Sequence, residues 1–305
     1  MVSKTETWTK ALHPLDMNGM AGRMAVLPAP KNKRGETLFL YDRHSSLDQW
    51  RPVIEYLNRY GAVTAPDLPG FGGMDSFYSI GRRPTINAYA DYLAAFFKLR
   101  FRRKQVTVVA VGFGFVVLTR MLQRYPALAR HVGRIISVGG YARHDDVQHV
   151  GQRQRRLHQA AYRLGSSWLA AKVVRYAYLN RWMLPRLVAH DSAVMLLQEP
   201  EAKAAGLARA IDSWRRNDLR TRFYTAAELL RFDNCARPLS LPLWHVRIID
   251  TRLGHMASEQ RMRVIFDRAT FIDSTVTRAD FQRLDDKLAA RLISAKLRQQ
   301  LSRFS

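Results

Sequence analysis

Cysteine is nearly missing from this sequence: Cys235 is the only one in 305 residues. No disulfide can therefore form within the chain, and no C-x-x-C or H-x-x-x-H spacing indicates a metal site. Cys235 lies in a turn-like segment, residues 232–238, with no nearby histidine and no glycine elbow. We interpret its thiol as a packed side chain rather than a nucleophile. No metal and no other cofactor is expected.

Long apolar runs are missing as well. No run reaches the roughly 18 residues that span a bilayer, and no secretory signal with an apolar centre is present. Residues 1–34 carry six basic residues against two acidic ones, which is weakly similar to a transit peptide, so we expect a mitochondrial location. Residues 24–34, with Pro28 and Pro30, are expected to form an extended arm entering the domain.

Acidic residues are few relative to basic ones. The chain has 25 Asp and Glu against 49 Lys and Arg, a formal net charge of +24 and a pI near 10.9, which is beyond what solubility requires. Only ten of the cations are lysines, and the planar fork of arginine suits phosphate and stacks on bases. A GC-rich coding sequence would also raise the arginine content, but it would spread the charge evenly. The uneven distribution favours a polyanionic partner.

The strongest asymmetry lies between Val147 and His190, where no Asp or Glu occurs. The basic residues of this stretch are Arg153, Arg155, Arg156, Arg163, Lys172, Arg175, Arg181 and Arg186. The aromatic residues interleaved with them are Tyr162, Trp168, Tyr176, Tyr178 and Trp182. Helical spacing predicts that Trp168 and Tyr178 face the core, whereas the others could stack on unpaired bases.

Two smaller basic clusters occur at residues 98–104 and 214–222. Several such clusters on one protein of this net charge predict nucleic-acid contact. The candidate RNA-binding residues are Arg100, Arg102, Arg103, Lys104, Arg153, Arg155, Arg156, Arg163, Lys172, Arg175, Arg215 and Arg216.

The order of strands, helices and turns indicates the fold. Residues 106–115 read V-T-V-V-A-V-G-F-G-F, a buried strand followed by a glycine turn, and residues 65–72 read A-P-D-L-P-G-F-G after a further apolar run. The expected elements are a strand at 37–41, a strand and loop at 62–72, a helix at 86–99, the strand and turn at 106–115, a helix end at 120–126, strands at 133–138, 242–249 and 269–272, and a helix after 280. With these motifs in this order, the chain resembles the α/β-hydrolase family.

The resemblance implies an α/β fold: a mostly parallel sheet flanked by helices, with a helical cap inserted into it. The expected division is an N-terminal arm at 1–34, an α/β-hydrolase-like core at 35–146 and 236–305, and a strongly basic helical cap at 147–235.

The resemblance also identifies where catalytic residues would lie. A G-x-S-x-G nucleophile elbow presents a serine at a strained strand-to-helix turn, and the central position of this turn is Gly112, which has no side chain to attack a carbonyl. The His-Gly pair that builds the oxyanion hole falls on Tyr41 and Asp42. A carboxylate at this position puts negative charge beside a developing oxyanion, which opposes catalysis.

The acid and the histidine of the family's triad have weaker matches. The acid would lie near Asp250 or Thr251, where a lone Asp is more typical of a turn. No histidine occurs in residues 273–282, after the last strand, and Ala279 is the best match to its position. These positions are expected to be degenerate.

No replacement for the missing groups is evident. His245 and His255 precede the last strand and are interpreted as structural or surface residues. Ser166 and Ser167 follow a glycine but fit a helical stretch better than an elbow. The sequence therefore predicts no catalytic residue and a protein that is not an enzyme.

Three functions remain. The first is a non-catalytic component of a ribonucleoprotein, a mitochondrial ribosome or its assembly intermediate, with rRNA and neighbouring proteins as partners and no small-molecule substrate. The second is an accessory subunit of a mitochondrial respiratory or ATP synthase complex that contacts anionic lipid headgroups. The third is a hydrolase with an unrecognised nucleophile. The sequence does not separate RNA from lipid, because phosphates of both attract the same side chains.

Overall fold

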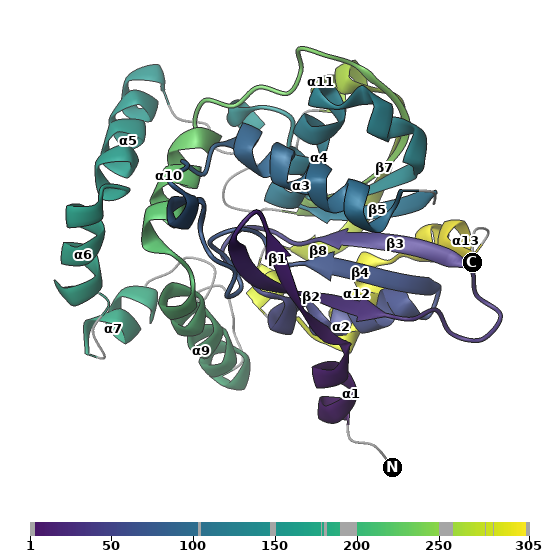
Figure 1. Ribbon diagram of the computed structural model, residues 1–305, viewed down its shortest axis with the longest axis horizontal. Coiled ribbons are helices and arrows are strands. Elements are labelled where there is room, and N and C mark those ends of the chain that lie inside the picture. Colours follow the sequence, from purple (N-terminus) through teal and green to yellow (C-terminus); the bar gives the residue numbers. More distant parts are fainter. Residues whose placement is uncertain are drawn as a thin grey trace.

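The computed structural model describes residues 4–102, 105–146, 151–177, 179, 182–189, 200–249, 259–277, 279–282 and 284–302. Within them, eight strands form one sheet in the order β1-β2-β4-β3-β5-β6-β7-β8 (Figure 1). The strands are β1 (Leu12–Met17), β2 (Met20–Leu27), β3 (Gly35–Leu40), β4 (Gly61–Pro66), β5 (Val106–Val111), β6 (Val132–Val138), β7 (Leu239–Ile249) and β8 (Phe266–Thr277). All neighbouring pairs from β4 to β8 are parallel. The expected mostly parallel α/β sheet is confirmed.

The central strands are apolar on both faces, because helices cover both sides of the sheet. Leu38 and Leu40 of β3 pack on one side with helices α3 (Ile86–Arg100) and α4 (Phe113–Arg124). Phe39 packs on the other side with α2 (Leu47–Asn58), α12 (Asp286–Leu292) and α13 (Ala295–Ser302). The alternation of side chains along each strand thus divides the core into two layers.

The N-terminal segment belongs to the sheet. Helix α1 (Lys4–Ala11) leads into β1, which pairs antiparallel with β2, and β2 pairs antiparallel with β4. Residues 24–27, expected in an extended arm, therefore lie in a strand that extends the core. The pairing of β2 with β4 supplies hydrogen-bond partners and burial for Ala25 that the sequence alone does not reveal.

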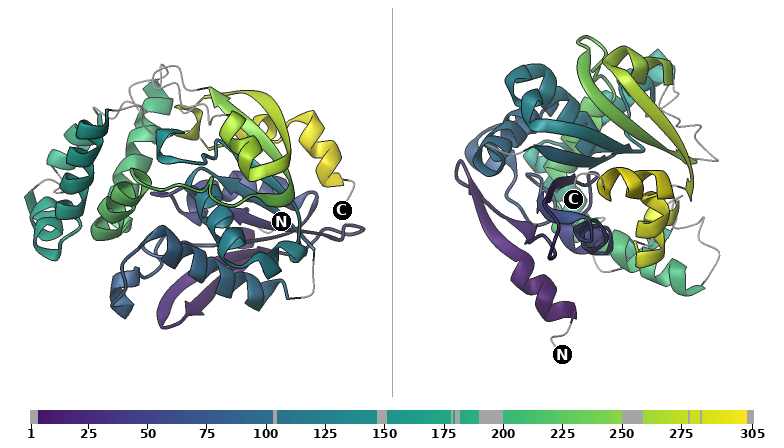
Figure 2. Two further views of the ribbon diagram at one scale, coloured as in Figure 1. Left: turned by 90° about the horizontal axis from the view of Figure 1, so that it is seen from above. Right: turned by 90° about the vertical axis from the view of Figure 1, so that its right-hand side faces the viewer.

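Within the described residues, five cap helices lie together at one end of the sheet, and α5 and α6 are the outermost (Figures 1 and 2). They are α5 (Gln152–Gly165), α6 (Trp168–Ala177), α7 (Met183–Ala189), α9 (Pro200–Arg216) and α10 (Leu219–Leu229). The loop that follows β4 holds the cap: the N–H of Asp218 donates to the carbonyl of Gly70, and the N–H of Gly72 donates to Oδ1 of Asn217. The cap therefore covers the carboxyl end of this strand.

The remaining elements are short. They are the helix α11 (Glu259–Ile265) and the 3-10 turns η1 (Phe77–Ile80), η2 (Pro126–His131), η3 (His144–Asp146) and η4 (Ala279–Gln282). Among the described residues, no helix combines the length and the apolar character that crossing a bilayer requires.

Candidate functional site

The turn between β5 and α4 has the geometry of a nucleophile elbow. Gly112 follows the strand directly, caps the helix and has φ +47° and ψ −111°. L-residues with side chains rarely adopt a positive φ, and they do so under strain at functional turns. The sequence placed the elbow at this position, and the backbone confirms it.

The carboxylate of Asp42 lies over this turn. A Cβ atom built on Gly112 would stand 2.6 Å from Cγ of Asp42 and 2.6 Å from its Oδ1. Oδ1 accepts hydrogen bonds from the N–H of Phe113 at 2.8 Å and of Arg43 at 2.9 Å. The carboxylate therefore occupies the space into which an elbow side chain would project.

These two amides occupy the positions of an oxyanion hole. In α/β-hydrolases the hole combines the N–H of the residue after the nucleophile with an N–H from the loop after an earlier strand. Phe113 follows Gly112, and Arg43 lies in the loop after β3. The sequence predicted negative charge beside the hole, and the structure places the charge on its donors. The sequence did not show that Asp42 fills the place of the missing side chain.

His44 lies in the same loop, and the sequence did not single it out. Its φ is +65°, and its ring meets the Phe71 ring edge-on at a centroid distance of 5.4 Å. Burial, assisted by Arg222 and Arg43, holds the pKa of His44 well below its usual range, so the imidazole is neutral. Its buried Nδ1 has no hydrogen-bond partner in the part of the chain described above.

Aromatic rings continue from His44 to the elbow. Phe71 stacks on Tyr89 at 6.3 Å between centroids, and Tyr89 meets Phe113 edge-on at 5.1 Å. The rings of Phe71, Tyr89 and Phe113 are fully buried. These buried rings exclude water from the elbow, and electrostatic interactions beside them are therefore stronger than in water.

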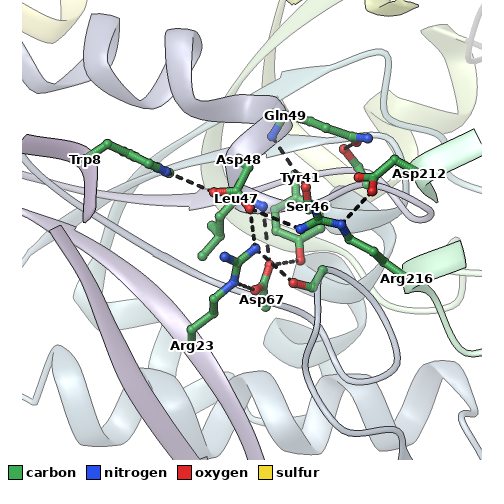
Figure 3. A network of polar contacts seen from close by, with 12 residues as sticks. Trp8, Arg23, Tyr41, Ser46, Leu47, Asp48, Gln49, Asp67, Asp212 and Arg216 are labelled. Atoms are coloured by element: carbon green, nitrogen blue, oxygen red, sulfur yellow. Dashed lines mark hydrogen bonds and ion pairs between the residues drawn. The ribbon is translucent and has the colours of Figure 1, made fainter. Parts of the chain in front are cut away.

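A partly buried network of ion pairs and hydrogen bonds fixes the start of the loop after β3 (Figure 3). Arg23 donates to Asp48 at 2.7 Å and to Asp67 at 2.8 Å, and the Tyr41 hydroxyl donates to Asp67 at 2.5 Å. Burial raises the pKa of Asp67 to about 7, against the opposing effects of Arg23 and Tyr41. Tyr41, expected at a degenerate oxyanion position, therefore ties the loop before Asp42 to the loop after β4.

Of the other expected catalytic positions, the structure describes Ala279, whose methyl side chain has no catalytic group. Ala279 begins η4, just after β8, where the sequence placed it. Thr251, Asp250 and His255 lie outside the described residues.

His245 is a structural residue inside the sheet. It is 1% exposed, and its Nδ1 lies 3.1 Å from Oγ of Ser137, a buried residue of the neighbouring strand. Burial lowers the pKa of His245 to about 4. Cys235 is half-buried, and burial with nearby Asp233 raises its thiol pKa to about 11, which makes the thiolate scarce.

Ser166 and Ser167 lie between α5 and α6 rather than inside one helix. They line a pocket of about 520 Å³ between the cap and η1. The other lining residues are Tyr78, Arg83, Arg163, Arg220, Tyr224 and Arg231. Four guanidinium groups in one pocket form a site suited to an anionic group. Of these four, the sequence singled out Arg163 and placed Arg220 in the basic cluster at 214–222, whereas Arg83 and Arg231 join them only through the fold.

The candidate RNA-binding residues do not form one surface. Arg100 and Arg102 lie just before the amino end of β5, opposite the edge that carries the cap, and Arg103 and Lys104 lie outside the described residues. On α9, Arg215 is exposed, whereas Arg216 pairs with Asp212 at 2.7 Å and with Asp48 at 3.8 Å (Figure 3). Helices α5 and α6 carry the rest, which are Arg153, Arg155, Arg156, Arg163, Lys172 and Arg175.

The cap also departs from its expected packing. Trp168, predicted to face the core, begins α6 and is 58% exposed. Tyr178 lies outside the described residues. Arg155 is half-buried and lies 3.4 Å from Asp145, so it bridges cap and core. Among the residues with described positions, no group of three or more His, Cys, Asp or Glu is placed to hold a metal ion.

Comparison with known proteins identifies the fold. No family model matches the sequence, and no curated protein matches it significantly. A protein assigned as an epoxide hydrolase from Klebsiella pneumoniae superposes with a TM-score of 0.65 at 14% identity, over 99% of this chain and 100% of its own. The enol-lactonase from Burkholderia xenovorans gives 0.63 at 14% identity, covering 91% of this chain and 96% of its own. A thermophilic esterase from Thermogutta terrifontis gives 0.62 at 14% identity, covering 96% and 98%.

These similarities overturn the function expected from the sequence. The similar structures are hydrolases, and nothing among them indicates a ribosomal, respiratory or ATP synthase role. The interpretation as a non-catalytic ribonucleoprotein component, its alternative as an accessory subunit, and the expectation that the protein is not an enzyme are therefore wrong. The prediction of a lost activity came from the missing serine at the elbow. The structure places the carboxylate of Asp42 where that side chain would lie. The chain has the α/β-hydrolase fold.

Proposed function

We propose that this protein is a hydrolase in which the carboxylate of Asp42 is the nucleophile. The position of this carboxylate carries the proposal: it fills the space above Gly112, and its Oδ1 accepts from the amides of Phe113 and Arg43. Carboxylates act as covalent nucleophiles in several enzyme classes. The hydrolases that share this fold support the same reaction class.

The reaction has two steps. In the first, Oδ2 of Asp42 attacks an sp³ carbon of the substrate, a C–O bond forms, and the bond from that carbon to its leaving oxygen breaks. The leaving alkoxide takes a proton from water, and an alkyl ester remains on Asp42. In the second, water adds to Cγ of this ester and the tetrahedral intermediate collapses to release the alcohol and restore the carboxylate. The amides of Phe113 and Arg43 stabilise the charge that develops on Oδ1.

The occupied amides favour an alkyl electrophile over an acyl substrate. An ester or amide substrate needs oxyanion donors for its own carbonyl oxygen, and here both donors already bind Asp42. Ring opening of an epoxide needs no donor at that position. The similar structure assigned as an epoxide hydrolase supports the same choice.

His44 is the base that we assign to the second step. It follows Asp42 by two residues, and its imidazole is neutral, so it has an unprotonated ring nitrogen that can accept a proton; the burial that lowers its pKa also makes it a weaker base than an exposed histidine. Its Nδ1 has no hydrogen-bond partner in the described part of the chain. Water bound between this nitrogen and the ester would be activated for attack on Cγ.

Isotope labelling tests the assignment. The protein is allowed one turnover of styrene oxide in H₂¹⁸O, and the peptide that contains Asp42 is analysed by mass spectrometry. Since water adds to Cγ, one ¹⁸O atom should enter the Asp42 carboxylate. Labelling absent from this peptide despite product formation would show that another group attacks, and no turnover of epoxides or esters by the wild-type protein would overturn the hydrolase proposal.

Three variants separate the roles. Asp42→Asn should lower turnover by about 10³-fold or more, as removal of a nucleophile does. His44→Gln should let the alkyl ester accumulate as a stable mass increase. Asp267→Asn removes an exposed carboxylate of β8 and should leave turnover unchanged. Wild-type turnover in Asp42→Asn would contradict the proposal.

A further inference from the structure

The outer side of the cap exposes many large apolar side chains. They lie on α5, on α6 and at the start of α7, and their exposed fractions range from 39% to 76%. The cap face consists of Leu157, Leu164, Trp168, Leu169, Val173, Tyr176, Trp182 and Met183. Helix α5 has no buried residue, and Ala171 is the only buried residue of α6. Soluble monomers rarely expose this many large apolar side chains on neighbouring helices without using them.

Helical spacing arranges these side chains in stripes. Leu169, Val173 and Tyr176 follow one another at i, i+4 and i+7 on α6, so they lie on one side of the helix. Leu157 and Leu164 are seven residues apart on α5 and share one side of that helix. The two helices pack on α10 and lie outermost in Figures 1 and 2, with the sheet on their far side.

Cations flank these stripes, and the stretch of the cap that carries the stripes contains no carboxylate. Arg153 and Arg156 precede Leu157 on α5. On α6, the Nζ of Lys172 lies 3.8 Å from the Trp168 ring centroid, so cation and aromatic ring share one surface. Residues 147–190 contain no Asp or Glu. The partner of this face must therefore be both apolar and anionic.

We propose that the cap face docks on the surface of an anionic lipid bilayer. Leucine and valine side chains enter the acyl boundary, tryptophan and tyrosine lie at the headgroup level, and arginines contact lipid phosphates. RNA accounts for the cations and aromatic rings but gives aliphatic side chains no apolar region to enter. The inference is independent of the proposed hydrolase activity, since it uses none of the residues around Asp42.

Vesicle co-sedimentation tests the proposal with the full chain. Vesicles of phosphatidylcholine with 30% phosphatidylserine are compared with phosphatidylcholine alone in 0.15 M NaCl. We expect binding to the anionic vesicles, weakened by added salt because the charges are screened. Each basic side chain near an anionic surface strengthens binding about fivefold, so Arg153→Gln, Arg156→Gln and Lys172→Gln together should weaken it by about 100-fold.

An apolar variant separates lipid from RNA. Leu169→Ser, Val173→Ser and Tyr176→Ser together should weaken vesicle binding at least about tenfold and leave binding to a 20-nucleotide single-stranded RNA unchanged. The matched control, Leu99→Ser with Val264→Ser, removes exposed apolar side chains outside the cap and should bind vesicles like the wild type. Circular dichroism verifies that each variant is folded.

Three results would overturn the proposal. These are no binding to anionic vesicles at 0.05 M NaCl, wild-type vesicle binding by the apolar variant, and RNA binding that survives where vesicle binding is absent. The last result would assign the face to nucleic acid.

Discussion

Replacing Gly112 with alanine measures whether the Asp42 carboxylate occupies the elbow. The new Cβ would stand 2.6 Å from Cγ of Asp42, at a backbone φ of +47°. Backbone strain contributes about 1–3 kcal/mol and overpacking a further 1–3 kcal/mol, so Gly112→Ala should lower the free energy of unfolding by about 2–6 kcal/mol. In an Asp42→Ala background the second contribution disappears, and the cost should fall to about 1–3 kcal/mol.

The double-mutant cycle is read from urea unfolding midpoints at constant slope. Gly73→Ala is the control for strain alone, because Gly73 has φ +102° and a Cβ atom added there would meet nothing within 4 Å. We expect a coupling of about 1–3 kcal/mol between Gly112 and Asp42. If Gly112→Ala costs the same in both backgrounds to within about 0.5 kcal/mol, the carboxylate does not fill this space and the proposed nucleophile loses its geometric basis.

Three further perturbations test the surroundings of the site. Burial raises the folded pKa of Asp67 to about 7, so the stability that protonated Asp67 contributes is lost as the pH rises through about 7. Arg23→Gln removes the cation that faces this carboxylate and should lower the free energy of unfolding by up to about 3–5 kcal/mol at pH 8 and by less at pH 5, measured by thermal melts. The control Arg51→Gln breaks an i,i+4 surface pair and should cost under about 1 kcal/mol in the same melts. His245 has a folded pKa of about 4 against an unfolded value near 6.5, so the free energy of unfolding should fall by up to about 3 kcal/mol as the pH drops from 6.5 to 4, and His245→Gln should flatten this slope in urea titrations. Sulfate should raise the melting temperature more than chloride at equal ionic strength, and Arg163→Gln should reduce the difference if the arginine pocket holds the anion.

The sequence by itself determined the sheet and its turn. Apolar runs such as residues 106–111 can be buried on both faces only in a parallel sheet covered by helices, and the glycine after this run marks the sharp turn into α4. The basic stretch at residues 147–190, which contains no Asp or Glu, could also be read from the sequence, because net charge does not depend on folding.

Only the tertiary structure decided the chemistry of the elbow. Asp42 and Gly112 lie 70 residues apart, and no spacing in the sequence shows that the loop after β3 lays a carboxylate over the turn after β5. Adjacent parallel strands bring their carboxyl ends together at one edge of the sheet, and β3 pairs directly with β5. The sequence could not predict that Trp168 is exposed either. Helical spacing shows which residues share one face of a helix, but it does not show which face packs against the core.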